Sequence, residues 1–249
     1  MEELRNNIKK IADLVEQNSH TVVLTGAGVS TESGVPDFRS PGSGLWTMVN
    51  PELFTIEGFK ANPKEFYESG MPFFKLLREA EPNETHTVLA ELEERGLVKA
   101  IITQNVDGLH QKGGAERVLE IHGTLSTASC LHCGRQFTLD QVAADIEEGL
   151  LPPLCPDDGE PLKPDVVLFG EPLASDYLEA LEEARKADLI IVLGSSMQVS
   201  PANELPSYGK RLVIINRTPT FYDQQAKVVV HESAARVMRL LKEELDNRL

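Results

Sequence analysis

The amino-acid sequence predicts an α/β protein with a doubly wound parallel sheet. Short runs of consecutive apolar, often β-branched residues recur along the chain, and helical patterns separate most of them. Strands that are buried on both faces have such continuous apolar runs, and their alternation with helices is typical of parallel sheets. Glycine or small polar residues follow several of these runs directly, which is expected where the edge of a sheet binds a ligand.

The predicted elements follow the chain in order. We expect strands at residues 21–25, 99–103, 118–123, 165–170, 188–196, 211–216 and 227–230. Apolar residues at helical spacing predict a helix over residues 2–17, mostly helical structure over residues 51–96 and a closing helix over residues 232–249. Residues 124–164 are polar, rich in proline and hold all three cysteines, so we interpret them as an inserted module.

Composition and charge narrow the classes of function. Of the 249 residues, 41% are hydrophobic and 25% are charged, and no apolar run reaches membrane-spanning length. Residues 1–10 lack the apolar centre of a signal peptide, which predicts a cytoplasmic protein that does not act at a membrane. A net charge of −15 argues against direct binding to nucleic acid. The same acidity suits a basic partner such as a lysine-rich peptide, or serves only to keep the protein soluble.

The glycine-rich segment after the first predicted strand has two interpretations. Its start, "GAG" at residues 26–28, is typical of a dinucleotide-binding loop, in which missing side chains let backbone N–H groups approach a pyrophosphate. Thr31 stands where the usual motif has its third glycine, so a plain tight turn is the alternative. "GVPDFR" follows directly, and its acidic, aromatic and arginine side chains favour a bound charged ligand over packing alone.

A second polar segment, "TQNVDGLH" at residues 103–110, leaves the next predicted strand at the same edge of the sheet. Gln104 and Asn105 offer donors and acceptors that suit ribose hydroxyls or a carboxamide. His122 lies in the predicted strand 118–123 near these residues, and its near-neutral proton affinity suits a general base. His110 continues into a helical pattern and is predicted to be structural. No comparable setting surrounds the other histidines, His20, His86, His132 and His231.

Several motifs follow one another along the chain: "GAGVS", "GVPDFR", "TQNVDGLH", "HG", "CLHC", "VVLFGE", "GSS" and "IIN". In order and spacing they resemble the sirtuins, a family of NAD-dependent protein deacylases, from about residue 21 to about residue 230. The resemblance implies a single catalytic domain over residues 1–249, with a Rossmann-like large lobe at about residues 1–40, 85–123 and 166–249. The small lobe is then a helical insertion at about residues 41–84 and a zinc-binding module at about residues 124–165. NAD and the acylated lysine are expected to meet in the cleft between the lobes.

The resemblance implies NAD-binding roles for residues of each polar segment. Gln104 and Asn105 are expected at the ribose next to the nicotinamide, and Val106 and Asp107 at the nicotinamide itself, with Asp107 binding its carboxamide. The adenosine half is expected at the "GSS" and "IIN" motifs, with Val228 near the adenine. The complete expected set is Ala27, Gly28, Thr31, Asp37, Phe38, Arg39, Gln104, Val106, Asp107, Gly194, Ser195, Ser196, Asn216 and Val228.

The resemblance also implies the activity, which is NAD-dependent protein deacetylation. The acetyl group of acetyl-lysine is transferred to ADP-ribose, and nicotinamide and O-acetyl-ADP-ribose are released. His122 is expected to be the general base, and Asn105 to help position the reacting ribose. The acetylated peptide is expected to bind as an added strand, with its acyl-lysine in an apolar tunnel. The expected substrate-binding residues are Val167, Phe169, Gly170, Glu171 and Val199.

The cysteine module departs from the pattern of the family. Cys130 and Cys133 form one C-x-x-C pair, but the second pair is reduced to Cys155 followed by Asp158. A structural zinc site has four ligands, and a carboxylate is a less usual one. We therefore predict zinc held by three thiolates and Asp158. Two alternatives stay open, namely a different fourth ligand and a vestigial module without stable metal.

Acyl preference and competing activities complete the prediction. Sirtuins that remove succinyl groups resemble one another in a tyrosine and an arginine three residues apart. Tyr67 is present, but no arginine follows at that spacing, so we expect activity on neutral acyl groups and poor activity on succinyl groups. The alternative functions are mono-ADP-ribosyl transfer to protein, NAD hydrolysis and non-catalytic NAD binding; the intact Asn105, Asp107 and His122 argue against the last. No additional regulatory region is evident, so a monomer is expected.

Overall fold

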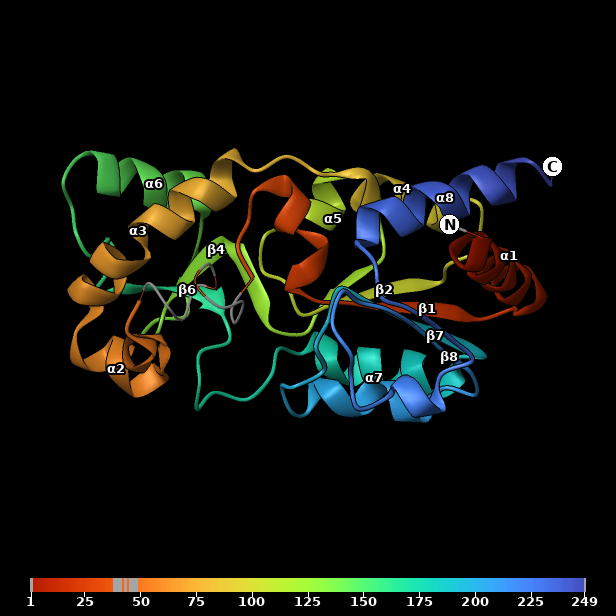
Figure 1. Cartoon of the computed structure of the whole chain (residues 1–249). Coiled ribbons are helices and arrows are strands. Elements are labelled where there is room, and N and C mark those ends of the chain that lie inside the picture. The colour runs from red at the N-terminus through yellow and green to blue at the C-terminus, as the bar shows by residue number, and fades with distance from the viewer. Residues whose placement is uncertain (1, 38–41, 43, 45–48, 249) are drawn as a thin grey trace.

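Two sheets organise the chain. The computed structural model describes residues 2–37, 42, 44 and 49–248. We call the part around the six-stranded sheet the large lobe and the part around the three-stranded sheet the small lobe (Figure 1). The strand order of the large sheet is β3-β2-β1-β7-β8-β9, and all of its strand pairs are parallel. The predicted doubly wound parallel sheet is therefore confirmed.

Helices cover both faces of the large sheet (Figure 1). The strands are β1 (Thr21–Thr25), β2 (Ala100–Thr103), β3 (Val118–Glu120), β7 (Leu189–Leu193), β8 (Leu212–Ile215) and β9 (Val228–Val230). One face packs against α1 (Glu2–Gln17), α4 (Glu84–Glu94) and α8 (Ala234–Asp246). The other face packs against α7 (Asp176–Lys186) and the 3-10 helix η5 (Ala202–Tyr208).

The sequence of β1 shows why this strand lies at the centre of the sheet. Every residue of "TVVLT" is buried. Because successive side chains of a strand point to opposite faces, Val23 packs in the core under α1, α4 and α8, whereas Val22 and Leu24 pack under α7. The three apolar residues at its centre are what a strand with two covered faces needs, and a buried threonine lies at each end.

Capping side chains fix where the neighbouring helices begin. Asn83 caps α4, and its side chain accepts a hydrogen bond from the N–H of Thr85 at 2.8 Å. His86 completes the cap, because its Nδ1 accepts the N–H of Asn83 at 3.1 Å. Ser233 caps α8 in the same way by accepting the N–H of Arg236. These caps satisfy N–H groups that would otherwise lack partners at the helix ends.

The small lobe has its own sheet and core (Figure 1). Its sheet order is β5 (Gln136–Thr138), β4 (Gly123–Cys130) and β6 (Leu162–Val166), with antiparallel pairs. Its helices are η4 (Pro51–Phe54), α2 (Ile56–Ala61), α3 (Pro63–Glu79) and α6 (Leu139–Glu147). The core of the lobe centres on Phe59, Phe66 and Tyr67, which are almost fully buried. The lobe boundaries given above stay a proposal.

Two predicted strands are wrong in part. Residues 165–170 do not join the parallel sheet, because residues up to Val166 pair antiparallel with β4 and the rest leave the sheet. The run is only partly buried, since Leu168 packs in the small-lobe core whereas Phe169 is exposed. Strand β3 ends at Glu120, so His122 lies in the turn that follows it. Gly123 adopts a φ of +75°, and a Cβ there would come within 2.0 Å of the Asp165 carbonyl oxygen, so glycine is required where the chain enters β4.

The remaining described elements are short. They are η1 (Ala27–Val29), η2 (Thr31–Ser33), α5 (Leu109–Lys112) and η6 (Asp223–Gln225). Among the helices of the described residues, none combines the length and the apolar character needed to span a bilayer.

Candidate functional site

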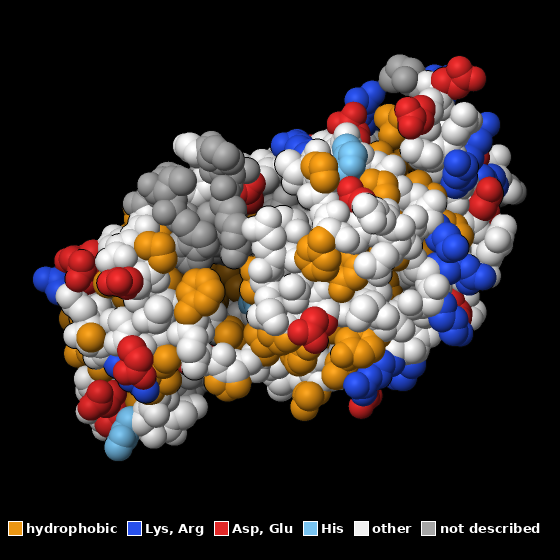
Figure 2. All heavy atoms as spheres, turned by 60° about the horizontal axis from the view of Figure 1, so that its bottom comes forward, with side chains coloured by type: hydrophobic (Ala, Val, Ile, Leu, Met, Phe, Trp, Pro, Cys, Tyr) orange, Lys and Arg blue, Asp and Glu red, His pale blue; other side chains and the backbone are white. Residues whose placement is uncertain are grey.

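A cavity of about 880 Å³ lies at the carboxyl ends of the large sheet, where the two lobes meet. Figure 2 shows hydrophobic side chains gathered around the hollow between the lobes. Both predicted catalytic residues, Asn105 and His122, line the cavity. So do most of the residues expected to bind NAD or peptide: Ala27, Gly28, Thr31, Asp37, Gln104, Val106, Val167, Phe169, Gly170, Glu171, Gly194, Ser195, Ser196, Val199 and Asn216.

The floor of the cavity is formed where the loops after β1 and β7 touch. The N–H of Gly28 donates to the carbonyl of Gly194 at 2.8 Å. A Cβ on Gly28 would lie 2.7 Å from that same oxygen, and a Cβ on Gly194 would lie 2.6 Å from the nitrogen of Val29. Glycine is therefore required on both sides of this contact. The two interpretations of "GAG" are not exclusive, because the tight approach of the two loops also leaves backbone exposed to the cavity.

A hydrogen-bonded chain of three side chains links two of the polar segments. The Asn105 amide donates to the Ser30 hydroxyl at 3.1 Å, and that hydroxyl donates to Asp107 at 2.7 Å. The second Asp107 oxygen accepts the N–H of Leu109 at 3.0 Å. Asn105 is buried, yet its Oδ1 has no hydrogen-bond partner among the described residues. A buried acceptor without a partner is costly, so this atom favours a ligand that donates a hydrogen bond.

Gln104 and Ser195 connect the loops after β2 and β7. The Gln104 amide donates to the Ser195 hydroxyl at 2.9 Å, and Ser195 Oγ in turn accepts the N–H of Met197 at 3.2 Å. Since both side chains line the cavity, their remaining donor and acceptor capacity faces the space where a ligand would bind.

A hydrogen bond to the main chain orients the ring of His122. Its Nδ1 lies 3.0 Å from the carbonyl oxygen of Gln104. A carbonyl can only accept, so Nδ1 carries the proton, and Nε2 keeps its lone pair in the neutral ring. Burial lowers the pKa of His122 below its ordinary value, and the hydrogen bond to Gln104 opposes part of that effect. The imidazole is therefore neutral at neutral pH and able to accept a proton at Nε2.

Four expected NAD-binding residues are placed differently or lie outside the described residues. Phe38 and Arg39 lie outside them. Val228 does not line the cavity, because it is buried in the core under α1, α4 and α8. Its predicted contact with adenine is therefore not supported. Asp107 does not line the cavity either, and both of its oxygens are already engaged by Ser30 and Leu109.

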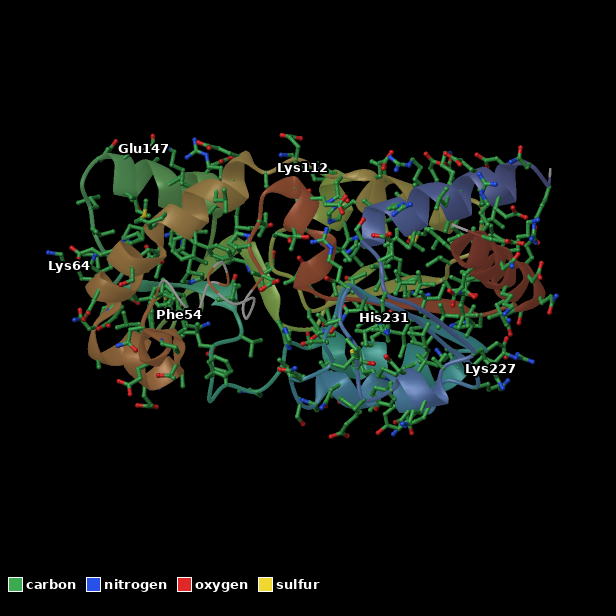
Figure 3. All side chains as sticks on the ribbon, in the orientation of Figure 1. Phe54, Lys64, Lys112, Glu147, Lys227 and His231 are labelled. Atoms are coloured by element: carbon green, nitrogen blue, oxygen red, sulfur yellow. The ribbon has the colours of Figure 1, made fainter. Side chains whose placement is uncertain are left out.

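Sequence reasoning missed several residues at each end of the cavity. The small-lobe end is aromatic and is lined by Phe54, Phe66, Phe73 and Phe74. The phenylalanines of α3 were visible in "EFYESGMPFFKLL", but only their arrangement on one side of the helix shows that they face the cavity. The opposite end is polar and is lined by Arg217, Thr218 and Glu232. In Figure 3, Phe54 lies among the small-lobe helices and His231 over the large lobe, where its Nδ1 donates to the carbonyl of Asn216 at 3.0 Å.

His110 lies below the cavity, in the interior of the large lobe. Its Nε2 is 2.9 Å from Thr25 Oγ1, and its ring lies 4.9 Å from that of His86. Burial, followed by the neighbouring His86, lowers the pKa of His110 to about 3. His110 has 1% of its surface exposed and does not line the cavity, which agrees with the structural role predicted for it.

The cysteine module forms a compact cluster at one end of the small-lobe sheet. The ligand atoms of Cys130, Cys133, Cys155 and Asp158 all lie within 4.8 Å of one another. The sulfurs of Cys133 and Cys155 are 3.6 Å apart, and the Cys130 sulfur is 3.4 Å from an Asp158 oxygen. A zinc tetrahedron with Zn–S bonds of about 2.3 Å has S–S edges of about 3.8 Å and S–O edges of about 3.5 Å. These residues therefore fit a structural zinc ion, with Asp158 as the fourth ligand.

Comparisons with known proteins agree with this geometry. A model of the Sir2 family matches residues 26–201. The chain is 45% identical over 236 residues to the NAD-dependent protein deacetylase 2 of Caldanaerobacter subterraneus subsp. tengcongensis, covering 94% of each protein. It is 47% identical over 228 residues to the NAD-dependent protein deacetylase of Saccharolobus solfataricus, covering 90% of this chain and 91% of that protein.

Solved structures give the same result. A Sir2 structure with a p53 peptide and NAD+ matches with a TM-score of 0.88 and 40% identity, covering 95% of this chain and 98% of that one. A structure of Sir2 bound to an acetylated peptide matches with a TM-score of 0.88 and 38% identity over the same shares. Family model, relatives and structures agree, and the chain belongs to the Sir2 family.

Proposed function

We propose that this protein is an NAD-dependent protein lysine deacetylase. The observation that carries the proposal is the pairing of two groups in one cavity. His122 presents a neutral Nε2 that is ready to accept a proton, and Asn105 presents a buried oxygen that has no partner in the described part of the chain. A base and an unsatisfied acceptor in one cavity suit the activation of a ribose hydroxyl better than they suit simple binding.

The residues around this pair fit a dinucleotide. Backbone of Gly26–Gly28 and the hydroxyls of Ser195 and Ser196 line the space beside the sheet edge, where such ligands bind in open parallel sheets. Asn216 and Thr218 line the far end, which suits the adenosine half. When bound, NAD supplies the ADP-ribose that accepts the acetyl group after nicotinamide has left.

His122 and Asn105 would then have separate tasks. The Gln104 carbonyl holds the His122 ring in one tautomer, so Nε2 can take the proton of a ribose hydroxyl without reorienting. Asn105 is fixed through Ser30, which leaves its Oδ1 to position the ribose. Asp107 acts in this proposal through Ser30, by holding the hydroxyl that holds Asn105.

The aromatic end of the cavity suits a neutral acyl chain. It is lined by Phe54, Phe66, Phe73 and Phe74. Among the described residues that line the cavity, the cationic one is Arg217, which lies at the opposite, polar end. Tyr67 points elsewhere, because its hydroxyl donates to the Leu162 carbonyl at 2.7 Å and its side chain is buried. A succinyl carboxylate would therefore lose its hydration without gaining a counter-ion, which disfavours binding.

Zinc has a structural part in the proposal. The cluster of Cys130, Cys133, Cys155 and Asp158 lies in the small lobe, and none of these residues lines the cavity. Three thiolates and a carboxylate would tie the turn after β4 to the turn before β6. The zinc ion therefore supports one wall of the site without contacting the reacting atoms.

A cytoplasmic location and a monomeric state belong to the proposal as well. Free cysteines arranged as a metal site are typical of a reducing compartment, which supports the location. Gel filtration coupled to light scattering tests the monomer, and a mass near 27.4 kDa is expected.

The activity is tested by incubating the purified protein with NAD and an acetyl-lysine peptide and analysing the mixture by mass spectrometry. Deacetylated peptide and O-acetyl-ADP-ribose in equal amounts are the expected products. ADP-ribosylated protein would identify a mono-ADP-ribosyl transferase. Free ADP-ribose with unchanged peptide would identify an NAD hydrolase. A matched succinyl-lysine peptide in the same assay tests the acyl preference, and comparable turnover of the two peptides would contradict it.

A further inference from the structure

The segment of residues 166–171, which we call the wall segment, forms one side of the cavity. Each of its residues lines the cavity. It leaves the small-lobe sheet at the end of β6 and contributes the apolar side chains of Val167 and Leu168 beside the aromatic end. The position of the wall segment therefore decides how wide the space for an acyl-lysine is.

Backbone hydrogen bonds attach the wall segment to both lobes. The N–H of Val167 donates to the carbonyl of His122 at 2.8 Å. Two residues further on, the N–H of Phe169 donates to the carbonyl of Phe54 at 3.0 Å, and the Phe169 carbonyl accepts the N–H of Ile56 at 3.0 Å. The segment thus connects the residue that carries the catalytic base with the first small-lobe helices. A shift of the wall segment would be felt at His122.

An ion pair closes the wall segment on itself. Lys163 Nζ lies 3.0 Å from Glu171 Oε2, and the two side chains have only 9% and 20% of their surfaces exposed. The other two protons of the ammonium go to backbone, since Nζ lies 3.0 Å from the Pro164 carbonyl and 2.8 Å from the Val166 carbonyl. Glu171 Oε2 also accepts the N–H of Leu168 at 2.8 Å. All three lysine donors are therefore satisfied, by the first and last residues of the wall segment and by Pro164 just before it.

A lysine this deeply buried is unusual unless it is fully paired, because removing an ammonium from water is costly. Its partners here are not scattered, but lie at Pro164, just before the wall segment, and at Val166 and Glu171, its first and last residues. The ion pair holds together the start and the end of the wall segment. An apolar pair would fill the same volume but would not fix this geometry, since only hydrogen bonds specify direction.

We propose that Lys163 and Glu171 are positioning residues for acyl-lysine binding. They fix the wall segment, and through it the width of the acyl-lysine channel and the place of the His122 backbone. Glu171 acts through the wall segment and not by contacting the peptide. This inference rests on the proposed deacetylase function and adds to it the residues that set the affinity for the acylated substrate.

Steady-state kinetics of Glu171→Met and Lys163→Met test the inference, since methionine accepts neither the Lys163 ammonium nor the Leu168 N–H as the carboxylate does. The Michaelis constant for an acetyl-lysine peptide at saturating NAD is expected to rise by about 10-fold or more, because a displacement of about 1 Å at a binding wall has effects of this size. The Michaelis constant for NAD at saturating peptide is expected to stay within roughly 2-fold, because the NAD-binding residues lie on the large-sheet loops.

The double variant Lys163→Met/Glu171→Met separates positioning from stability. Removing one partner leaves a buried charge unpaired, whereas removing both does not, so the unfolding midpoint is expected to recover in the double variant. The Michaelis constant for the peptide is expected to stay raised, because the directional contacts are still lost. If the ion pair only stabilised the fold, both the unfolding midpoint and the Michaelis constant for the peptide would return toward their wild-type values.

Glu183→Gln is the matched control. Glu183 is another buried carboxylate, with 3% of its side chain exposed, and it pairs with His20, Arg117 and Lys186 on the face of the large lobe that carries α7. It does not line the cavity. The control is expected to lower the unfolding midpoint and to leave both Michaelis constants within roughly 2-fold of the wild-type values.

The outcomes distinguish the inference from the function on which it rests. Wild-type protein that does not deacetylate the peptide would overturn the proposed function, and the inference with it. Active wild type whose two single variants keep a peptide Michaelis constant within roughly 2-fold of normal would overturn the inference alone. So would a double variant with a normal peptide Michaelis constant.

Discussion

The two lobes hold their functional groups in place by different means. The large lobe positions Gln104, Asn105 and Ser195 on loops that leave strands buried on both faces, and hydrophobic packing determines where those strands end. The small lobe has a smaller core, and Cys133 and Asp158 of its metal-ligand cluster are exposed. The reacting groups of the large lobe therefore stand at the ends of packed strands and are oriented by hydrogen bonds, whereas an ion pair and the metal-ligand cluster hold the acyl-binding side.

His122→Ala tests the role of the large lobe and is expected to have the largest effect. We expect the deacetylation rate to fall by about 10²- to 10⁴-fold, which is the range for loss of a general base. The unfolding midpoint is expected to change little, because His122 sits in a turn at the sheet edge and not in the core. Rate and midpoint are measured on the same preparation. Near-normal turnover would contradict the assignment of the base.

The small-lobe half is tested by Asp158→Ala. Loss of the fourth ligand is expected to reduce bound zinc well below one ion per chain, as measured by plasma emission spectroscopy on purified protein. Hydrogen exchange is expected to increase in β4, β5 and β6 while protection of β1 and β7 stays unchanged. Asp157→Ala is the control, since Asp157 pairs with Arg135 and is not in the cluster. Equal zinc content in the two variants would show that Asp158 is not a ligand.

The interior of the large lobe is expected to be sensitive to acid. Burial, the largest cause in both cases, lowers the pKa of His110 to about 3 and of His86 to about 4, whereas an unfolded histidine has a pKa near 6.5. Below pH 6.5 these two histidines therefore bind more protons in the unfolded chain than in the folded chain. The contribution of these two histidines to the free energy of unfolding is fully present above that pH. It falls as the pH drops, by up to about 1.4 kcal/mol per histidine per pH unit.

Urea unfolding at pH 7.5, 6 and 5 measures this effect. His110→Asn is expected to give a shallower loss of unfolding free energy with decreasing pH than the wild type, because one buried titrating group is gone. His132→Asn, a change at an exposed site, is expected to leave the slope unchanged. An identical slope in all three proteins would contradict the prediction.

The smallest effect is expected for Tyr67→Phe. The change removes the hydrogen bond from the Tyr67 hydroxyl to the Leu162 carbonyl and keeps the ring in the small-lobe core. The free energy of unfolding is expected to fall by about 1–2 kcal/mol, the cost of one buried hydrogen bond. Turnover of acetyl-lysine peptide is expected to stay normal, because Tyr67 does not line the cavity between the lobes. A large loss of activity would place Tyr67 in the acyl site after all.

The sequence predicts the large lobe better than it predicts the small lobe. The runs before "GAG", "QNVD" and "GSS" end where the sheet ends, so the polar rim could be found before any contact was known. The "VVLF" run was misplaced because an apolar stretch that lines a cavity has the same composition as a buried strand. The role of Asp107 could not be predicted, because it depends on a hydroxyl 77 residues earlier in the chain. Likewise, nothing in "LKPDVVLFGE" shows that its lysine turns back onto its glutamate.

The contact between Gly28 and Gly194 limits how this protein can be changed. Because neither position admits a side chain, the floor beneath the cofactor is made of main-chain atoms, which point mutations cannot alter without separating two loops. Libraries intended to change dinucleotide preference gain nothing from these positions. The side chains open to variation lie at the polar end of the cavity, at Arg217, Thr218 and Glu232.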